Sequence, residues 1–556
     1  MMLGVGLATA LSSAAAAVDV PDIPGSADVG RIKPEQKLPN IDQTKGGKIK
    51  IPSSVPSVEI PEGAKTIQFE LRAVNIDGST AFTPEQLRDI YAPYIGTTIT
   101  LDVAYIMAGA ITERYRNAGY FLSLAYIPPQ KINGGIITIK VVEGYVGSVI
   151  LDGETAEESV VQEYIAQIKA KKSLKSQEME SFLLRLNDLP GYDFSGVLSA
   201  LEGGEEGALE LILTSKEKIG SGSFNFDNNG SRFLGANQAS LSYSASLLPL
   251  QQTSVSGLSS LPSDELKYAT LNHSLTLAPG FTAEFAGGYT KAKPAYTLEA
   301  FEIESSSSFF SGSVNYQWIR QRQENLALKL TLDSRNSVTD ILDTPLTRDH
   351  VRATRLNATY DVIDSWLGYN IISTTLSRGI DGLGSSKKGD TNLSRGEATP
   401  DFTKAELSLT RLQGISQDWS LLMTAALQRA SGPLYSSEEF GYGGQSFGRA
   451  FDSSEISGDH GAAGSLELRY GGWNDLQPLS LSPYAFYDIG AVWNDDITQV
   501  KRESGASAGF GVRSSSDIGM SGNIGLAWPL TREVGTPIYG QKATQPRILL
   551  QINQSF

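Results

Sequence analysis

The sequence contains no cysteine, which excludes disulfides, thiol nucleophiles and thiolate metal sites together. Only three histidines are present, and no two of them are close in sequence, so a histidine-based metal site is not expected. The chain also lacks the G-x-x-x-x-G-K-[ST] and H-E-x-x-H motifs, the usual carriers of nucleotide hydrolysis and zinc proteolysis. We therefore expect no metal, no other cofactor and no enzymatic activity.

Long apolar runs are also missing. A membrane helix needs about 18 or more consecutive apolar residues, and the nearest candidate, residues 2–18, is interrupted by Ser12 and Ser13. If this chain spans a membrane it must do so with strands closed into a barrel, because no other non-helical structure satisfies its backbone groups in hydrocarbon. Charged residues make up 19% of the chain and the net charge is −15, which argues against nucleic acid as a partner.

The N-terminal 64 residues show no sign of a folded domain. Residues 1–17 have the pattern of a secretory signal peptide, an apolar core followed by the small residues Ala14 to Ala17. The basic segment that normally begins such a signal is absent, since the first basic residue is Arg31. The true start of the protein is therefore not determined. A disordered apolar tail is the alternative interpretation of residues 1–17. Residues 18–64 are rich in Pro, Gly, Lys and Asp and are predicted to form a disordered or extended linker.

Two successive segments share the element order β-α-α-β-β. In the first, residues 65–144, apolar side chains recur at helical spacing over 102–118, with Asp102 as the expected cap and Gly119 as the stop. The second, residues 145–217, repeats the order with strands at 146–151, 192–201 and 208–215 and helices at 159–168 and 176–187. A repeat of this length favours two small tandem domains over a solenoid.

From residue 218 onward the helical period disappears and short alternating segments take over. Leu466 and Leu468, for example, alternate with Glu467 and Arg469. At about 20 residues per strand and connection, this part of the chain suffices for about 16 membrane strands. A soluble sandwich would also alternate, but the apolar face is sustained and aromatic residues such as Trp493, Trp528 and Phe556 lie near strand ends, as in interface girdles.

The last strand shows this pattern most clearly. Ile548, Leu550 and Ile552 fall on one face with the terminal Phe556, and Gln554 is the polar exception. The segment has the length of a tilted membrane strand. Because many bacterial outer-membrane barrels end on such a strand with a terminal Phe, Phe556 is the expected assembly signal.

Residues 444–448 match the G-x-S-x-G nucleophile motif. That motif requires a strand-turn-helix setting, whereas here it follows a Gly-rich run in a region predicted to be all β. We therefore do not interpret it as a hydrolase site.

The most informative segment is 443–461, which reads GGQSFGRAFDSSEISGDHG. Together with the terminal Phe, the two β-α-α-β-β units and the sequence Phe486-Tyr487-Asp488-Ile489-Gly490, it resembles the outer-membrane transporters of two-partner secretion, the haemolysin and filamentous-haemagglutinin exporters of Gram-negative bacteria. The resemblance covers residues 66–556. It implies two periplasmic POTRA domains, α+β in class, followed by an all-β, antiparallel, 16-stranded transmembrane barrel over 218–556.

In that family a loop folds back into the pore, and we expect it here at about residues 430–464. The family motif V-R-G-Y corresponds to Gly448, Arg449, Ala450 and Phe451, the motif S-G-D-x-G to Ser457, Gly458, Asp459 and Gly461, and the barrel-wall motif F-x-D-x-G to Phe486, Asp488 and Gly490. Gly448 replaces the usual Val and Ala450 the usual Gly, so the loop tip is expected to differ in shape. Arg449 is retained.

A physical reason supports a contact between Arg449 and Asp488. The residues alternating with Asp488 are mostly apolar, including Tyr487, Ile489 and Trp493, which places Asp488 in the lumen. An arginine on an inward-folded loop could bind this carboxylate with two hydrogen bonds. The alternative is a solvated Arg449 on an outer loop and a separately hydrated Asp488; the resemblance favours the pair.

The resemblance implies a passive pore in the outer membrane, with its N-terminal domains in the periplasm, that exports one large unfolded exoprotein. The expected partners are this cargo, outer-membrane lipid and the barrel-assembly machinery, and the chain is expected to be a monomer. The POTRA-like domains would capture cargo by strand addition, with residues 122–127 and 194–201 as candidate contacts, although ordinary packing against their own helices explains these segments equally well. The alternatives are a barrel insertase of the same superfamily and a solute porin or receptor.

Overall fold

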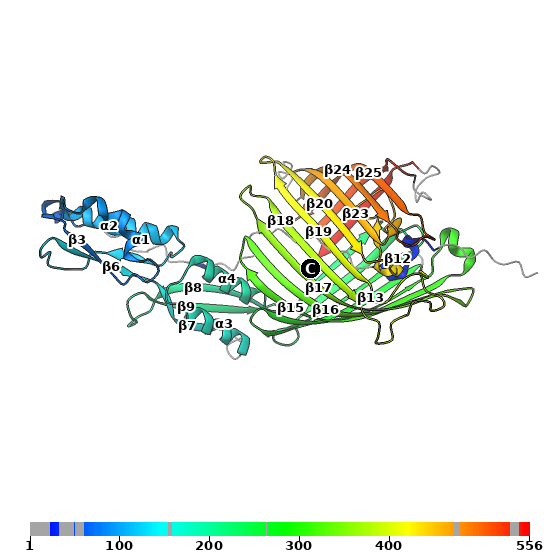
Figure 1. The fold of residues 1–556 in the computed structure, drawn as a ribbon, viewed down its shortest axis with the longest axis horizontal. Helices are drawn as coiled ribbons and strands as arrows, with labels where there is room; N and C mark the ends of the chain where they lie inside the picture. The colour runs from blue at the N-terminus through cyan, green and yellow to red at the C-terminus, as the bar shows by residue number, and fades with distance from the viewer. Residues whose placement is uncertain are drawn as a thin grey trace, which may run out of the picture.

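The fold consists of two small α/β domains in a row and a large β-barrel (Figure 1). A computed structural model describes residues 23–32, 49–50, 60–153, 158–218, 220–262, 264–471, 479–533 and 544–556. The expected signal peptide, residues 1–17, lies outside the described residues. None of the helices in these ranges is both long and apolar enough to cross a membrane.

The first domain packs two helices on a mixed sheet. The sheet has the order β3-β6-β5, with β3 parallel and β5 antiparallel to β6. Its core forms because α2 turns Met107, Ile111 and Tyr115 toward the alternate residues Ile137 and Ile139 of β6, all of which are buried. The elements are η3 Glu62–Thr66, β2 Gln68–Glu70, β3 Ala73–Asp77, α1 Pro84–Tyr91, η4 Ala92–Tyr94, β4 Thr98–Thr100, α2 Leu101–Asn117, β5 Leu124–Tyr126 and β6 Ile136–Val142.

The alternation of residues 66–74 predicts one strand at the start of this domain, but the strand is divided in the structure. Its first part, β2, pairs with β4, and its second part, β3, pairs with β6. Leu71 lies between them, fully buried, and its N–H donates to the Thr97 carbonyl at 3.0 Å. Burying this side chain turns the backbone between two sheets, which a pattern of alternation cannot show.

The second domain repeats this connectivity. Its first strand β7 is parallel to its last strand β9, and β8 is antiparallel to β9. The sheet gains a fourth strand, β1 (Ile49–Lys50), which pairs in parallel with β8 at Gly196 and Val197. The elements are β7 Tyr145–Asp152, α3 Ser159–Lys169, α4 Ser176–Asn187, β8 Tyr192–Ala200 and β9 Ala208–Glu217.

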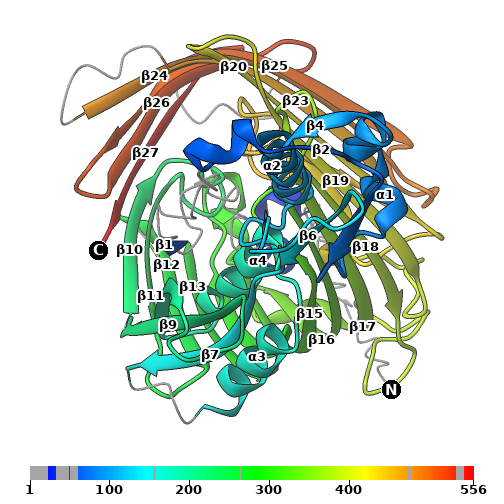
Figure 2. The same cartoon turned by 90° about the vertical axis from the view of Figure 1, so that its left-hand side faces the viewer.

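Polar contacts fasten the second domain to turns at the near end of the barrel. Arg320 binds Asp188 through two hydrogen bonds, of 2.6 and 2.7 Å. Arg185 donates to the carbonyl oxygens of Gln317 and Trp318, both at 3.0 Å. Figure 2 shows both small domains in front of this opening. This end of the barrel is therefore the end through which material from the domains would enter.

Sixteen antiparallel strands form the closed barrel. This confirms the predicted fold class, α+β N-terminal domains followed by an all-β, 16-stranded antiparallel barrel. The strands are β10 Gly220–Asp227, β11 Asn237–Ala245, β12 Gln251–Leu261, β13 Leu266–Ala278, β14 Phe281–Ala292, β15 Glu304–Arg320, β16 Glu324–Ile341, β17 Thr344–Ile363, β18 Tyr369–Gly379, β19 Thr403–Gly414, β20 Trp419–Ala430, β23 His460–Tyr470, β24 Leu479–Trp493, β25 Arg502–Ser516, β26 Met520–Pro529 and β27 Arg547–Ser555.

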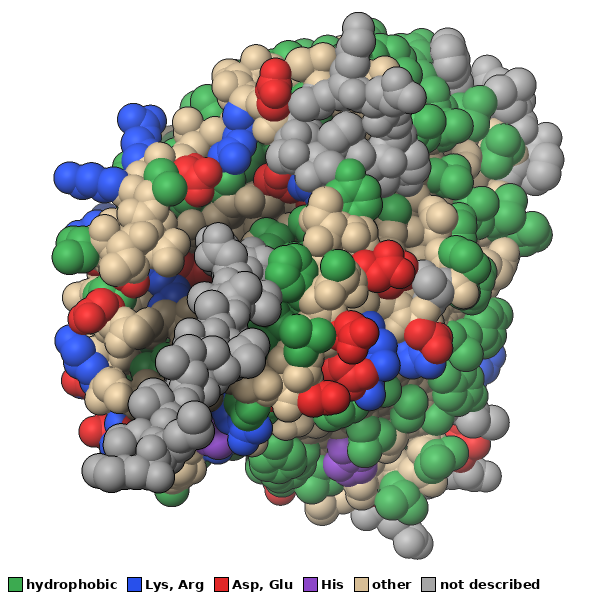
Figure 3. Space-filling view, turned by 90° about the vertical axis from the view of Figure 1, so that its right-hand side faces the viewer, with side chains coloured by type: hydrophobic (Ala, Val, Ile, Leu, Met, Phe, Trp, Pro, Cys, Tyr) green, Lys and Arg blue, Asp and Glu red, His purple; other side chains and the backbone are tan. Residues whose placement is uncertain are grey.

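The wall alternates between an apolar outer face and a polar inner face. Leu466 and Ile489 are 51% and 53% exposed, while their neighbours in the same strands, Glu467 and Asp488, are 2% and 0% exposed. At the end of the barrel far from the small domains, charged side chains of both signs intermix, and hydrophobic side chains gather along the margin (Figure 3). An apolar outer wall with a polar lumen is the arrangement of a transmembrane barrel.

The barrel closes through a short seam between β10 and β27, which lie side by side in Figure 2. Phe556 extends this seam: its N–H donates to the Gly222 carbonyl at 3.0 Å, and the Gly222 N–H donates back to Phe556 at 2.8 Å. The ring of Phe556 lies over Gly222, where a Cβ would come within 2.3 Å of it. The ring itself is 66% exposed, so it is available on the outer surface.

Deleting Phe556 is expected to lower the amount of assembled barrel severalfold, because it removes two seam hydrogen bonds and the exposed terminal ring. Heat-modifiable mobility of the protein in outer-membrane fractions measures the folded form. Phe556→Trp, which keeps an aromatic terminus and the backbone, serves as the control. Equal amounts of folded barrel in the deletion and the wild type would contradict this role.

Part of the predicted linker is packed, which corrects the expectation for residues 18–64. Residues 23–32 form two short 3-10 turns, η1 Gly25–Ala27 and η2 Val29–Arg31, at the far end of the barrel (Figure 1, blue). Ala27 and Val29 are each 1% exposed and pack among apolar residues of the barrel. Arg31 binds Glu439 at 2.7 Å. Small apolar residues and one charge suffice to anchor a segment whose composition is typical of a linker.

Candidate functional site: a loop folded into the barrel

The connection between β20 and β23, residues 431–459, folds into the barrel. It contains a short hairpin of β21 (Phe440–Tyr442) and β22 (Ile456–Gly458), in which Phe440 pairs with Gly458. Apolar side chains of this loop pack against lumen-facing residues of the wall, among them Phe486 and Leu549. The loop was expected at about 430–464, but β23 begins at His460, so residues 460–464 belong to the wall.

Arg449 lies at the buried tip of the loop and binds the wall. Its Nε and Nη2 donate to the two oxygens of Asp488 at 3.1 and 2.8 Å. Nη1 donates to Glu467 at 2.5 Å, and the guanidinium carbon lies 3.5 Å from the centre of the Phe486 ring. The structure therefore brings together the arginine and the acidic residue that the sequence suggested as a pair. The contact has the bidentate geometry that a lysine cannot reproduce.

Asp488 binds the loop backbone as well. The N–H groups of Gly448 and Arg449 donate to it at 3.1 and 3.0 Å, and the hydroxyl of Ser465 donates at 2.7 Å. The carboxylate is 0% exposed. A buried carboxylate is tolerated here because both oxygens accept several hydrogen bonds, most of which come from the loop or from Arg449 itself.

Glu467 is the second acidic residue of this site, and the sequence analysis did not single it out. It accepts hydrogen bonds from Arg449, from Arg469 at 2.7 Å and from Arg513. One carboxylate thus faces three guanidinium groups. Its lumen-facing position could have been found, since Glu467 alternates with Leu466 and Leu468 in the same way that Asp488 alternates with Tyr487 and Ile489.

Glycines of the three motifs make room for aromatic rings of the loop. A Cβ on Gly490 would lie 2.3 Å from the ring of Tyr442, and one on Gly461 would lie 2.0 Å from the ring of Phe440. Gly448 has a φ of +76°, and a Cβ there would lie 2.8 Å from the Tyr442 ring. The valine usual at this position in the family would not fit this backbone.

Ala450 and Phe451 complete the loop tip. They are 4% and 0% exposed, and the Phe451 N–H donates to the Gly448 carbonyl at 2.8 Å, which closes a turn. The Phe451 carbonyl accepts a hydrogen bond of 2.7 Å from Arg547 of β27. The departures from the family pattern therefore lie in a compact turn that faces the wall.

The second motif anchors the other end of the loop. Ser457 donates to Glu439 at 3.1 Å, and Gly458 lies in β22. Asp459, which is 0% exposed, accepts hydrogen bonds from Arg395 at 2.5 Å and from the N–H of Leu434 at 2.8 Å. The aspartate thus joins the two ends of the loop to the β18–β19 connection that carries Arg395.

Further ion pairs fasten the loop around the barrel. Asp452 binds Arg232, at 2.7 Å, and Arg547, at 3.2 Å, on either side of the β10–β27 seam. Glu438 binds Arg355 of β17 at 2.7 Å and Lys404 of β19 at 2.9 Å. These four cations and two carboxylates were not identified from the sequence, because each pair joins residues far apart in the chain.

The site consists of ion pairs and hydrogen bonds that hold the loop against the barrel wall. Within the described residues no group of three or more histidines or carboxylates is placed to hold a metal. Ser446 of the G-x-S-x-G segment lies between β21 and β22, and a strand rather than a helix follows it. What the arrangement can do is hold the loop across the lumen through contacts that water and other polar groups can replace.

Comparisons with known proteins agree with this architecture. Residues 210–513 match the sequence profile of the family described as haemolysin secretion/activation protein ShlB/FhaC/HecB, and residues 69–144 match the POTRA domain of ShlB type. The outer membrane transporter CdiB of Dickeya dadantii is 22% identical over 83% of both chains. The heme/hemopexin transporter protein HuxB of Haemophilus influenzae (strain Rd) is 24% identical over 49% of both chains.

Solved structures show the same fold. CdiB from Escherichia coli superposes with a TM-score of 0.70 at 19% identity, covering 90% of this chain and 93% of the other. CdiB from Acinetobacter baumannii superposes with a TM-score of 0.60 at 14% identity, covering 88% and 90%. At these identities the likeness concerns the fold of the domains and the barrel.

Proposed function

The chain belongs to the haemolysin secretion/activation protein family ShlB/FhaC/HecB, and we infer that it exports an exoprotein from the periplasm to the cell exterior in two-partner secretion. It is an outer-membrane transporter with periplasmic POTRA domains. The observation that supports export most directly is the polar loop, held by Arg449 and Asp488, inside a closed barrel with the small domains at its entrance.

The transport is passive in this proposal. The chain has no nucleotide-hydrolysis motif, and the periplasm holds no ATP, so folding of the cargo outside the cell would provide the direction. The protein has no enzymatic activity of its own here. It works as a monomer, and the barrel-assembly machinery inserts it into the membrane.

The lumen must clear for a polypeptide to pass. The loop and residues 23–32 occupy the barrel interior and are joined by the contact between Arg31 and Glu439. Apolar contacts hold part of both segments, Ala27 and Val29 in one and Phe451 in the other. The charged groups of both segments are held by ion pairs and hydrogen bonds, which an entering polar backbone and water can replace.

Cargo capture is assigned to the edge of the first domain. β5 pairs only with β6 among the described residues, so one edge of Leu124–Tyr126 is free for an added strand. In the second domain β8 is already paired with Ile49–Lys50 of the same chain. Of the two candidate contacts, the segment 122–127 is therefore the better acceptor. Main-chain pairing there would tolerate many cargo sequences.

A photoreactive side chain at position 124 is expected to cross-link to the exoprotein encoded beside this chain. The same group at Val197 of β8 is the matched control, since Val197 pairs with Lys50 and should cross-link within the chain. Adducts are resolved by mass spectrometry of the full-length transporter. Cargo adducts at position 197 but not at 124 would contradict the assignment.

Export itself is tested by deleting this transporter. The exoprotein encoded beside it is then expected to be lost from the culture medium. An insertase would instead lower the amounts of other barrel proteins in the outer membrane. Unchanged secretion with depleted barrels would refute the proposed function and support that alternative.

A further inference from the structure

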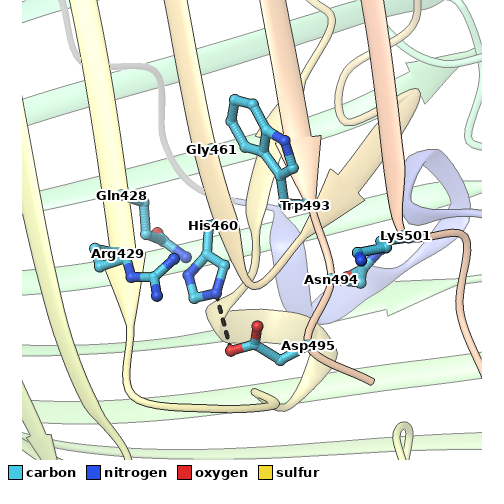
Figure 4. Close-up of a pocket in the computed structure, with 8 residues that line it drawn as sticks. All are labelled: Gln428, Arg429, His460, Gly461, Trp493, Asn494, Asp495 and Lys501. Atoms are coloured by element: carbon cyan, nitrogen blue, oxygen red, sulfur yellow. Dashed lines mark hydrogen bonds and ion pairs between the residues drawn. The ribbon is translucent and has the colours of Figure 1, made fainter. Parts of the chain in front are cut away.

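A cavity of about 420 Å³ lies at the far rim of the barrel, away from the small domains. The ends of β20, β23, β24 and the segment before β25 form it (Figure 4). His460 pairs with Trp493 across β23 and β24, and Trp493 pairs with Arg502 across β24 and β25. Residues from three neighbouring strands therefore meet at one height at the edge of the membrane-facing wall.

The cavity belongs to the outer surface of the wall. Arg429 has the same strand parity as Leu427, which is 47% exposed, while Gln428 between them is 6% exposed and donates to loop carbonyls in the lumen. Trp493 has the parity of Ile489, which is 53% exposed. Since Leu427 and Ile489 face lipid, Arg429 and Trp493 mark the level at which the apolar band gives way to the outer interface.

Two cations at the cavity have no anionic partner. Within the part of the chain that the structure describes, neither Arg429 nor Lys501 forms an ion pair or a side-chain hydrogen bond. Arg502 lies beside them, its guanidinium carbon 5.9 Å from the centre of the Trp493 ring. Most arginines of the lumen, by contrast, are paired with carboxylates.

The carboxylate at the cavity, Asp495, is already engaged. It lies 2.9 Å from Nε2 of His460 (Figure 4, dashed line). Nδ1 of His460 lies 3.1 Å from the backbone nitrogen of Ala430, whose N–H must donate to it. The proton of the neutral imidazole is therefore on Nε2 and points to Asp495. Asp495 thus accepts a hydrogen bond from His460, and among the described residues it forms no ion pair with Arg429 or Lys501.

The wall below the cavity fits an acyl chain. Ala462 and Ala491 are cross-strand neighbours of outward parity beneath His460 and Trp493. Leu427 pairs with Ala462 on the other side, and Ile489 lies further down the same face. Two small side chains therefore lie between larger apolar ones on the outward face, next in register to the residues that line the cavity.

We propose that this cavity binds the phosphate of a phosphorylated glycolipid in the outer leaflet, with Arg429 and Lys501 on the phosphate and the acyl chain along Ala462 and Ala491. Arginine and lysine are the side chains that bind phosphate oxygens, and basic pockets at membrane level recognise lipid head groups. Trp493 lies at the depth where an indole borders both head groups and acyl chains. The bound lipid would brace the wall strands that flank the loop, β20 and β23.

The test uses the full-length protein in detergent and titrates it with bisphosphorylated lipid A, followed by native mass spectrometry. The variant Arg429→Gln/Lys501→Gln is expected to weaken lipid binding by at least about tenfold, since each lost charge-assisted hydrogen bond accounts for that order. Lys291→Gln/Lys293→Gln is the matched control, because these two exposed lysines lie at the same end of the barrel and are already paired with Glu304. It should bind as the wild type does.

Two further measurements test whether free phosphate competes with the lipid and whether the lipid's phosphate is needed for binding. A third verifies that the variants are folded. Inorganic phosphate at millimolar concentration should not displace the lipid, and dephosphorylated lipid A should bind as weakly as the double variant does. Heat-modifiable mobility verifies that each variant is folded. If the double variant does not fold, lipid binding by Lys501→Gln alone is compared with that of the wild type. Equal binding by folded variant and wild type, or displacement by free phosphate, would overturn the proposal.

Discussion

Replacing Arg449 by alanine is expected to abolish most export while leaving the barrel in the outer membrane. The guanidinium binds two wall carboxylates, Asp488 and Glu467, and its loss leaves Asp488 buried without its cation. Removing one partner of a buried ion pair typically costs about 3–5 kcal/mol. The barrel does not depend on this contact, because its strands are closed by their own hydrogen bonds.

Asp488→Ala is expected to have a similar effect, and the two changes together should be strongly non-additive. The second substitution removes a group whose partner is already gone, so the double variant should export about as much as either single variant. Glu467→Gln should reduce export less than Asp488→Ala does, because Arg449 keeps both hydrogen bonds to Asp488.

Secretion of the adjacent exoprotein at matched barrel levels is the measurement, with sensitivity to a large antibiotic as an independent reading of an opened pore. Arg469→Ala is the control, since Arg469 binds Glu467 in the same cluster without touching the loop. Normal export by Arg449→Ala, or losses that simply multiply in the double variant, would show that this contact does not hold the loop in the lumen.

Exchanging the two charges is not expected to restore export. An aspartate at position 449 would place a second carboxylate on the side of Glu467, which now binds Arg449, and the two like charges would repel. The shorter side chain would also lose the contacts to Ser465 and Phe486. The charge-exchanged protein should therefore behave like Arg449→Ala.

Removing residues 66–216 is expected to eliminate export and leave a barrel that still inserts. Cargo capture is assigned to the two small domains, and the sheet that closes the barrel, from β10 to β27, contains none of their strands. Some cost to the barrel is expected, since Leu250 of the β11–β12 turn packs into the core of the second domain. Secretion and folded-barrel abundance are scored together.

A smaller deletion, residues 66–144, is the matched control for that cost. It leaves the contacts between the second domain and the barrel in place, including Arg320 with Asp188, and removes only the domain that carries the free edge of β5. It should abolish export with little loss of barrel. Normal export by either deletion variant would contradict the assignment of cargo capture to the small domains and of membrane insertion to the barrel.

Much of the architecture could be predicted because it depends on local periodicity. The helix over 102–118 and the strand through Asp488 each carry a repeat that reports which side faces a core or a lumen. Asp488 was placed in the lumen from its neighbours alone. The same alternation would have placed Glu467 there too, but of its three arginine partners only Arg469 lies on the same strand; Arg513 comes from β25 and Arg449 from the loop.

Residues 23–32 show the limit of this reasoning. A segment with Pro24, Gly25 and Ser26 has the composition of a linker, yet Ala27 and Val29 are buried because the barrel supplies apolar surface from residues more than 200 positions away. The same holds for Asp452, whose partners Arg232 and Arg547 come from near opposite ends of the barrel sequence. No local pattern encodes such contacts.

The sequence by itself determined the class of each part of this protein: two repeated α+β units and a wall of alternating strands with Asp488 in the lumen. Periodicity determines these features because it decides locally which side chains can be buried. The inward-folded loop with Arg449 was implied by the family resemblance of its motifs and not by periodicity. Only the tertiary structure decided which charges meet, that Glu467 binds three arginines and that Arg31 joins the N-terminal segment to the loop. It also decided that Arg429 and Lys501 have no anionic partner among the described residues. Ion pairs depend on the distance between atoms, and in a closed barrel that distance is set by the register of all sixteen strands.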